Sequence, residues 1–227
     1  MRIAFFGGTF DPPHCGHLTI ARAAADRLRL DKVLFAPVGR QPLKQNSSVA
    51  SFDDRVAMVS LAIAQDARFE VSTIDAPLPN GRPNYTVDTI LRLKNGLAPE
   101  DKLFCLIGAD SFLSVSHWYR AAELLLACNF IVAGRPGTGP LDAGLENTRQ
   151  RLPRGMHIAG KSQQQTGLLE FTLTNDAGEH SNLYCLPDLH EDVSATAVRS
   201  SLTRQSFSSD ELPEEVAEYI RTHHLYR

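Results

Sequence analysis

The chain has 227 residues, a formal net charge of −3 at pH 7, and 43% hydrophobic and 22% charged residues. This length suits one domain with an elaborated insertion and is enough to bury a sizeable core. Both signs of charge are spread along the sequence, which argues against a nucleic-acid-binding surface. No apolar run is long enough to span a membrane, so we expect no membrane partner.

The four cysteines are scattered and lack CxxC spacing. Cys105 and Cys128 lie in apolar runs and are expected to be small buried hydrophobic residues. We therefore expect reduced thiols and a cytoplasmic location. The sequence opens directly with a core-like strand, so no signal peptide is expected.

Strand-like apolar runs alternate with helix-like periodic runs, which favours an α/β fold with a parallel sheet and helices on both faces. Strands are expected at Arg2–Phe6, Lys32–Ala36, Phe69–Ser72, Leu103–Ile107 and Phe130–Ala133. Helices are expected at Leu18–Leu28, from Ser51 through Ile63, from Thr86 to Gly96, at Trp118–Ala127, at Ser194–Thr203 and at Pro213–Thr222. The last two make up a C-terminal helical region at about 194–223.

The interval from Gly134 to about Asp188 is rich in Gly, Pro, Gln, Thr and Asn and lacks a regular pattern. We interpret residues 136–188 as an irregular insertion with one or two extra strands, such as Met156–Ala159 and Leu183–Leu186. The whole chain, 1–227, is expected to form a single domain.

Residues 7–17 read GGTFDPPHCGH and connect the first expected strand to the first expected helix. Paired glycines let backbone N–H groups approach a ligand closely, and a helix N-terminus adds donors and partial positive charge. Such a place binds phosphate. His14 and His17, spaced by three on a first helical turn, can present two imidazoles to one phosphate chain.

This stretch resembles the HxGH nucleotidyltransferases, and its longer form, GGTFDPxHxGH, resembles the nicotinate-nucleotide adenylyltransferases. The resemblance implies a Rossmann-like fold and transfer of AMP from ATP to nicotinate mononucleotide, giving deamido-NAD and pyrophosphate in NAD biosynthesis. It also implies that His14 and His17 are catalytic and bind ATP. Gly8, Thr9 and Phe10 would line the nucleotide cradle.

Two further stretches resemble family elements that receive the pyridine nucleotide. Residues 84–90, NYTVDTI, resemble SYTxxTL with Asn84 in place of Ser, and imply that Tyr85 and Thr86 bind the acceptor. Thr86 can cap a helix whose N–H groups accept a carboxylate. Residues 106–111, LIGADS, place Gly108 near ATP and Asp110 near the ribose hydroxyls, at the strand edge where open α/β sheets bind ligands. Trp118 is the only tryptophan, and its face can stack on the pyridine ring.

The remaining family-like elements supply hydroxyl and cationic groups. Arg135, in an RPG element, is expected to meet the acceptor phosphate. Residues 193–199, VSATAVR, resemble ISSTxIR and imply that Ser194, Thr196 and Arg199 hold the outer ATP phosphates. Lys44, in the loop after the second strand, matches a basic position of the family and can close over phosphates.

Metal chemistry is expected only through the substrate. His14, Cys15 and His17 lack a second Cys/His pair at zinc-site spacing. Mg²⁺ bound with ATP is favoured instead, with no dedicated protein ligands.

One further motif is set aside, and two alternative functions stay open on the sequence alone. Residues 155–162, GMHIAGKS, satisfy the Walker A pattern, but no core-like strand precedes them and no good helix start follows. A different acceptor, such as nicotinamide mononucleotide or phosphopantetheine, would keep the histidine pair. A nucleotide-binding sensor without catalysis would also fit, although intact His14 and His17 argue against it.

Overall fold

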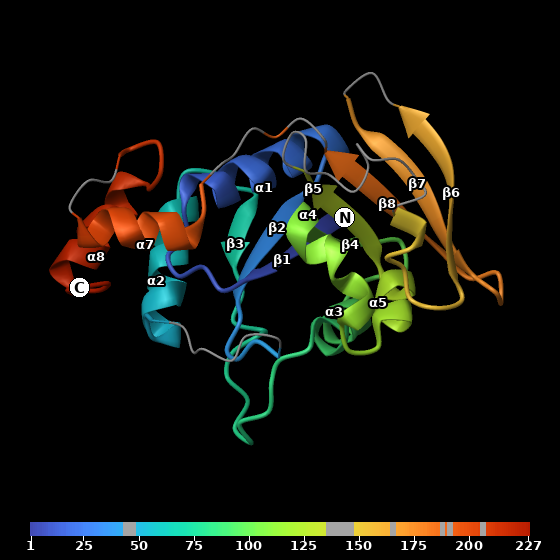
Figure 1. Cartoon of the computed structure of the whole chain (residues 1–227), viewed down its shortest axis with the longest axis horizontal. Coiled ribbons are helices and arrows are strands. Elements are labelled where there is room, and N and C mark those ends of the chain that lie inside the picture. The colour runs from blue at the N-terminus through green and yellow to red at the C-terminus, as the bar shows by residue number, and fades with distance from the viewer. Residues whose placement is uncertain (43–48, 135–147, 164–166, 187–188, 190–192, 205–207) are drawn as a thin grey trace.

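The computed structural model describes residues 1–42, 49–134, 148–163, 167–186, 189, 193–204 and 208–227. The strands in these ranges form one eight-stranded sheet in the order β3-β2-β1-β4-β5-β8-β7-β6. Figure 1 shows the sheet through the middle of the molecule, with β6–β8 at one end and α7 and α8 at the other. The fold class is therefore the expected α/β class, although the sheet is not wholly parallel.

Six strands of the sheet run parallel to one another, because β1 pairs in parallel with β2 and β4, β2 with β3, β4 with β5, and β5 with β8. The five predicted strands are all present as β1 (Arg2–Gly8), β2 (Lys32–Pro37), β3 (Phe69–Val71), β4 (Lys102–Gly108) and β5 (Asn129–Ala133). Their side chains alternate between two buried clusters: Phe6 packs with one helical layer, while Phe5 packs with the other. This alternation explains why these strands appear as continuous apolar runs.

The expected insertion contains three strands, not one or two: β6 (Met156–Gln163), β7 (Leu169–Asn175) and β8 (His180–Leu186). β7 pairs antiparallel with both neighbours. We missed β7 although Leu169, Phe171 and Leu173 alternate along it and are buried. The Walker-like stretch enters β6 at Met156, so its apolar residues belong to a strand and not to a phosphate-binding loop.

Helices cover both faces of the sheet. One buried cluster joins it to α1 (Cys15–Leu28), α2 (Phe52–Ile63), α7 (Ala195–Thr203) and α8 (Glu214–Thr222). The other cluster joins it to α3 (Thr86–Asn95), α4 (Ala109–Leu113), the 3₁₀ turn η1 (Val115–His117) and α5 (Ala121–Ala127). Ser51 caps α2 by accepting from the Asp54 N–H at 3.1 Å, as its sequence pattern predicted.

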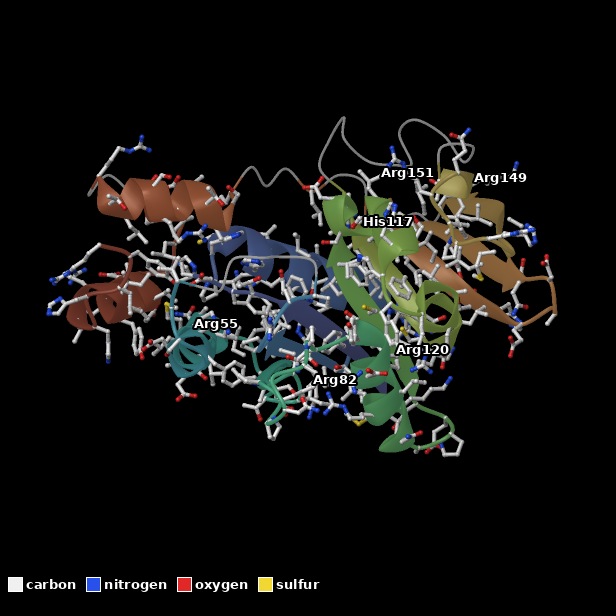
Figure 2. All side chains as sticks on the ribbon, turned by 60° about the horizontal axis from the view of Figure 1, so that its bottom comes forward. Arg55, Arg82, His117, Arg120, Arg149 and Arg151 are labelled. Carbon is white, nitrogen blue, oxygen red and sulfur yellow. The ribbon has the colours of Figure 1, made fainter. Side chains whose placement is uncertain are left out.

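The helix predicted over Trp118–Ala127 begins three residues late, at Ala121. Trp118 is extended at the end of η1, and Arg120 has a left-handed φ of 51°. The Arg120 guanidinium donates to Glu123 of α5 at 2.7 Å and to Asp88 of α3 at 3.1 Å. Figure 2 labels Arg120 near these two helices. The interruption frees Trp118 and Tyr119 from the helix and lets them line the site described below.

From β1 the chain adds β2 and β3 on one side and then places β4 and β5 on the other. The direction of the strand order therefore reverses between the adjacent strands β1 and β4. Ligands of open α/β sheets bind at the carboxyl ends of the strands at such a switch point.

None of the helices in the described ranges is long and apolar enough to cross a membrane.

Candidate active site

A cavity of about 1000 Å³ opens at the carboxyl ends of β1, β4 and β5. Gly8, Gly108 and Ala133 mark the three strand ends in its wall. Residues at the N-terminal ends of α1, α3, α4 and α7 also line it, so four helix N-termini contribute to one site. Backbone donors and partial positive charge at these ends favour anionic ligands.

Gly8, the last residue of β1, lies where there is little room for a side chain. A Cβ at this position would meet the Phe10 ring at 3.0 Å. Gly8 and Thr9 both line the cavity. A larger residue at position 8 would push into the floor of the site or into the ring beneath it.

His14 and His17 lie together at the start of α1, with ring centroids 3.7 Å apart. His14 is the N-cap residue, and its backbone N–H donates to Nδ1 of His17 at 3.2 Å. Because Nδ1 accepts, the neutral His17 ring carries its proton on Nε2 and can donate from there. Both residues line the cavity, so the pair reaches the same ligand space.

His17 is held in its neutral form. Burial, and secondarily the electrostatic effect of the neighbouring His14, lowers the pKa of His17 well below its ordinary value. A neutral imidazole with a fixed Nε2 proton is a directional hydrogen-bond donor rather than a diffuse positive charge.

Phe10 lies outside the lining of the cavity, and its side chain is buried beneath the loop. It is 1% exposed and has a positive φ of 50°. Its ring meets His17 edge-on, with centroids 4.9 Å apart, and also packs on Phe6. Phe10 therefore supports the His17 ring from the core side.

The start of α7 contributes only part of the predicted phosphate set. Ser194 lines the cavity and caps α7 by accepting from the Ala197 N–H at 3.2 Å. Thr196 and Arg199 lie outside the lining. Arg199 donates through Nη1 to the Asp11 carbonyl at 2.7 Å and through Nη2 to Thr196 Oγ1 at 3.3 Å, so it braces the residue 7–17 loop.

The opposite part of the cavity is aromatic. Tyr85 and Thr86 line it, and the Tyr85 ring packs on Tyr119 with centroids 4.4 Å apart. α3 begins at Thr86, but the cap residue is Tyr85, one position earlier than predicted, and it makes no side-chain capping bond. Thr86 and Val87, the first two residues of α3, both line the cavity.

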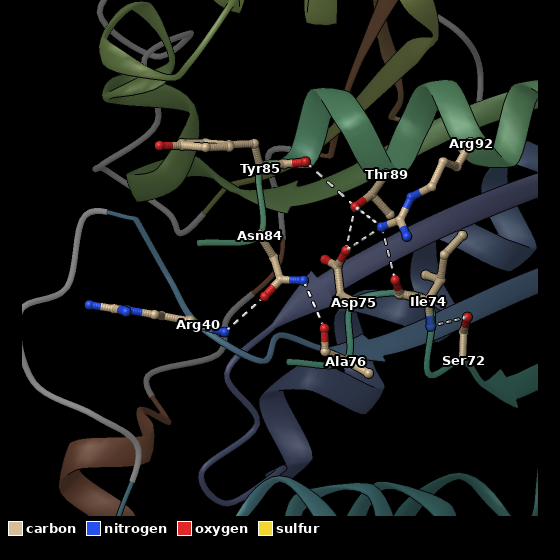
Figure 3. Close-up of polar contacts among 9 residues, drawn as sticks. All are labelled: Arg40, Ser72, Ile74, Asp75, Ala76, Asn84, Tyr85, Thr89 and Arg92. Atoms are coloured by element: carbon tan, nitrogen blue, oxygen red, sulfur yellow. Dashed lines mark hydrogen bonds and ion pairs between the residues drawn. The ribbon is translucent and has the colours of Figure 1, made fainter. Parts of the chain in front are cut away.

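A buried polar cluster holds this helix start in place (Figure 3). The Asn84 amide accepts from the Arg40 N–H and donates to the Ala76 carbonyl, each at 3.0 Å. Thr89 donates to the Asp75 carboxylate. A serine, as in SYTxxTL, is too short to bridge both segments, so the Asn84 departure has a structural purpose.

Asp75 is 4% exposed and lines the cavity. Burial raises its pKa, while the Thr89 hydroxyl and Arg92 oppose that shift. Sequence reasoning missed Asp75 because it lies in a connecting segment without a motif. It also missed Tyr119, which adjoins Trp118 and was visible as half of an aromatic pair.

The other acceptor-side predictions meet at the same wall. Gly108, Asp110 and Trp118 all line the cavity, as does Tyr119. The Trp118 indole N–H donates to Ser114 Oγ at 3.4 Å, which orients the ring. Lys44 and Arg135 lie outside the described residues. No group of three or more His, Cys, Asp or Glu side chains arranged to hold a metal ion occurs in the described ranges.

Comparisons with known proteins agree on one family. The cytidylyltransferase-like family model matches residues 5–201. A probable nicotinate-nucleotide adenylyltransferase of Gloeobacter violaceus is 37% identical over 99% of this chain and 96% of its own length. One from Neisseria meningitidis is 37% identical, covering 99% of this chain and 98% of its own length.

The fold has a solved counterpart as well. The nicotinic acid mononucleotide adenylyltransferase of Plasmodium falciparum, solved in complex with NaAD, superposes with a TM-score of 0.68 at 15% identity. That match covers 99% of this chain and 97% of the other. With the full-length relatives above 30% identity, the chain belongs to the nicotinate-nucleotide adenylyltransferase family of nucleotidyltransferases.

Proposed function

We propose that this chain carries out the reaction after which its family is named, the transfer of AMP from ATP to nicotinate mononucleotide. The products are deamido-NAD and pyrophosphate. The observation that carries the proposal is the His14–His17 pair, rings 3.7 Å apart, in a cavity that also takes in the start of α3. The pair suits a phosphate chain, and the helix start suits a second anionic ligand.

In the proposed arrangement, ATP occupies the part of the cavity near β1, α1 and α7. Gly8 and Thr9 cradle its phosphates, and Ser194 reaches them from α7. Arg199 acts indirectly, because its Nη1 donates to the Asp11 carbonyl at 2.7 Å and so stabilises the loop that contacts the phosphates. Thr196 Oγ1 accepts from the Arg199 guanidinium and orients it. Lys44 completes the proposed set from the neighbouring loop.

Nicotinate mononucleotide occupies the aromatic part of the cavity. Trp118 stacks on the pyridine ring, and Tyr85 with its partner Tyr119 closes the pocket. The ring carboxylate lies against the start of α3 at Thr86. Asp110 accepts from the ribose hydroxyls, and Arg135 pairs with the acceptor phosphate.

The chemical step needs no protein nucleophile. A phosphate oxygen of nicotinate mononucleotide attacks the α-phosphorus of ATP, and the bond to the β-phosphate oxygen breaks, releasing pyrophosphate. The acceptor phosphate is already anionic, so no general base is required. His17 donates from Nε2 to the charge that develops on the α-phosphoryl group, and His14 adds a second donor beside it.

Mg²⁺ enters this proposal as part of the substrate, bound to the ATP phosphates. The donors around the proposed phosphate position are imidazoles, hydroxyls and backbone N–H groups, which are poor ligands for a hard cation. The nearest carboxylate in the motif, Asp11, is 3% exposed and already accepts three hydrogen bonds. The buried thiols Cys105, Cys128 and Cys185 support our proposal of a cytoplasmic location.

The proposal is tested by measuring pyrophosphate release from MgATP with a panel of acceptors. We expect rapid release with nicotinate mononucleotide, slow release with nicotinamide mononucleotide, and none with phosphopantetheine. ATP binding without pyrophosphate release on any acceptor would favour a nucleotide sensor. Pyrophosphate release only with phosphopantetheine would overturn the assignment of nicotinate mononucleotide as the acceptor.

A further inference from the structure

Asp11, inside the residue 7–17 loop, has a buried carboxylate to which the proposed function gives no direct role. It is 3% exposed. Oδ1 accepts from the Tyr226 hydroxyl at 2.6 Å and from the Ala50 N–H at 3.1 Å. Oδ2 accepts from the Val49 N–H at 2.7 Å. One carboxylate therefore joins the loop to two segments that are distant in sequence.

A buried cation lies next to this junction. Arg55 of α2 is 2% exposed, and its Nη1 donates to the Thr9 carbonyl at 2.7 Å. Figure 2 labels Arg55 at α2, on the side of the molecule that carries α7 and α8. Burial lowers the pKa of Arg55, and the negative charge of the nearby Asp11 opposes that shift. Displacing either of these two buried charges would leave the other less compensated, so both favour the observed arrangement of the loop.

Tyr226 comes from the segment 223–227, which follows α8 and folds back onto the core. Tyr226 is 8% exposed and packs in the same apolar cluster as Phe10. The Leu225 N–H donates to the Ile220 carbonyl at 3.0 Å, and Thr203 Oγ1 of α7 donates to the Tyr226 carbonyl at 3.4 Å. These contacts hold the segment in place in addition to the hydrogen bond from the Tyr226 hydroxyl to Asp11.

The bonds converge on the backbone that leads to the histidine pair. Arg55 holds the Thr9 carbonyl, Tyr226 holds the Asp11 carboxylate, and Arg199 holds the Asp11 carbonyl. His14 is three residues further along the chain. A catalytic group must be held within about 0.5 Å of its productive position, and misplacement by about 1 Å can cost 10²-fold in rate.

We propose that Tyr226 is a positioning residue for the triphosphate half of the site, acting through Asp11 on the loop that carries His14 and His17. This inference rests on the proposed role of the histidine pair. Without the Tyr226 hydroxyl, Asp11 Oδ1 keeps only the Ala50 N–H, and the loop is held less firmly. ATP use then suffers, while the acceptor pocket, built by α3 and Trp118, stays intact.

The test is Tyr226→Phe, which removes the hydroxyl and keeps the ring in its apolar packing. We expect kcat to fall about tenfold and the KM for ATP to rise several-fold, within the range that misplaced groups cost. The KM for nicotinate mononucleotide should stay within about twofold of wild type, because its pocket does not contact this junction. Isothermal titration with a non-hydrolysable ATP analogue alone should show the same weakening.

Tyr219→Phe is the matched control. The Tyr219 hydroxyl also donates to a carboxylate, Asp54 Oδ1 at 3.0 Å, and also links the C-terminal region to α2, but it does not touch the loop. Both variants are assayed well below their melting temperatures. A purely structural role would give the two variants the same kinetics, and that result would overturn the proposal. Wild-type protein inactive with nicotinate mononucleotide would instead refute the proposed function, a distinct outcome.

Discussion

At the residue scale, the site depends on how two imidazoles are oriented. The His14 N–H fixes the His17 tautomer through Nδ1, and the Phe10 ring supports His17 from below. Both constraints come from residues of the same eleven-residue motif. The motif therefore specifies the chemical groups and also the contacts that orient them.

Removing the His17 imidazole should lower turnover without unfolding the protein. We expect His17→Ala to reduce kcat by roughly 10²–10³-fold, the usual loss for one preorganised electrostatic donor. Steady-state pyrophosphate release at saturating MgATP measures this. Arg22→Ala, an exposed change on the same helix, is the control and should leave kcat unchanged. Near-normal turnover in a folded His17→Ala protein would refute a catalytic role for His17.

The same residue predicts how stability depends on pH. The pKa of His17 in the folded protein lies well below the ordinary 6.5. Below that pH the unfolded chain therefore binds a proton on His17 that the folded protein does not bind. The free energy of unfolding should therefore fall as the pH drops below about 6.5. Urea unfolding of wild type and His17→Asn at about pH 7.5 and 5.5 tests this. The variant should lose less stability over that interval; an equal loss would show that His17 is not the group responsible.

At the element scale, specificity follows from the start of α3. The N-cap residue Tyr85 provides no side-chain cap, and Thr86 and Val87 line the cavity. Helix N–H groups match a carboxylate, which only accepts hydrogen bonds. A carboxamide would turn an NH₂ toward these donors or leave one unpaired, at a cost of about 1–3 kcal/mol.

We therefore expect kcat/KM to favour nicotinate mononucleotide over nicotinamide mononucleotide by on the order of 10²-fold or more, because a charge-assisted bond is also lost. Rates with both acceptors at saturating MgATP measure the ratio. Trp118→Ala should weaken both acceptors and leave the ratio nearly unchanged, since stacking does not distinguish the two rings. Equal rates, or a preference for the amide, would contradict this account of α3.

Elements with a strong local signal could be predicted from the sequence. The apolar strands β1–β5 and the capped helix α2 have the predicted cores, with ends shifted by one or two residues. The late start of α5 could not be predicted, because it depends on Arg120 reaching Asp88 on a different helix. β7 was missed because the polar composition around it outweighed its short alternation.

The same division applies to the site. The histidine pair and the strand-end glycines are close in sequence, so their spacing was informative. The Asp11–Tyr226 bond joins residues 215 positions apart, and no local pattern announces it. Asp75 and Asn84 are likewise defined by the fold, since each acts on segments that only the sheet brings together.

At the scale of the whole molecule, the sheet joins the parts of the chain into one body. Alternate residues of β4 and β5 enter opposite clusters: Leu106 and Ile131 pack with α1 and α8, while Cys105 and Phe130 pack with α3 and α5. β8 continues the sheet from β5 by parallel pairing, so the inserted strands share the second cluster. This arrangement supports our proposal that residues 1–227 form a single domain.

A single domain of this construction should unfold in one cooperative step. Trp118, the only tryptophan, reports on the α4–α5 side, whereas far-ultraviolet circular dichroism reports on all helices. We expect the two probes to give the same urea midpoint, because neither helical layer keeps a complete core once the sheet opens. MgATP should raise both midpoints together by binding only the folded state. Separate midpoints, or a ligand effect on one probe only, would show that the side of the sheet with α4 and α5 unfolds independently of the rest.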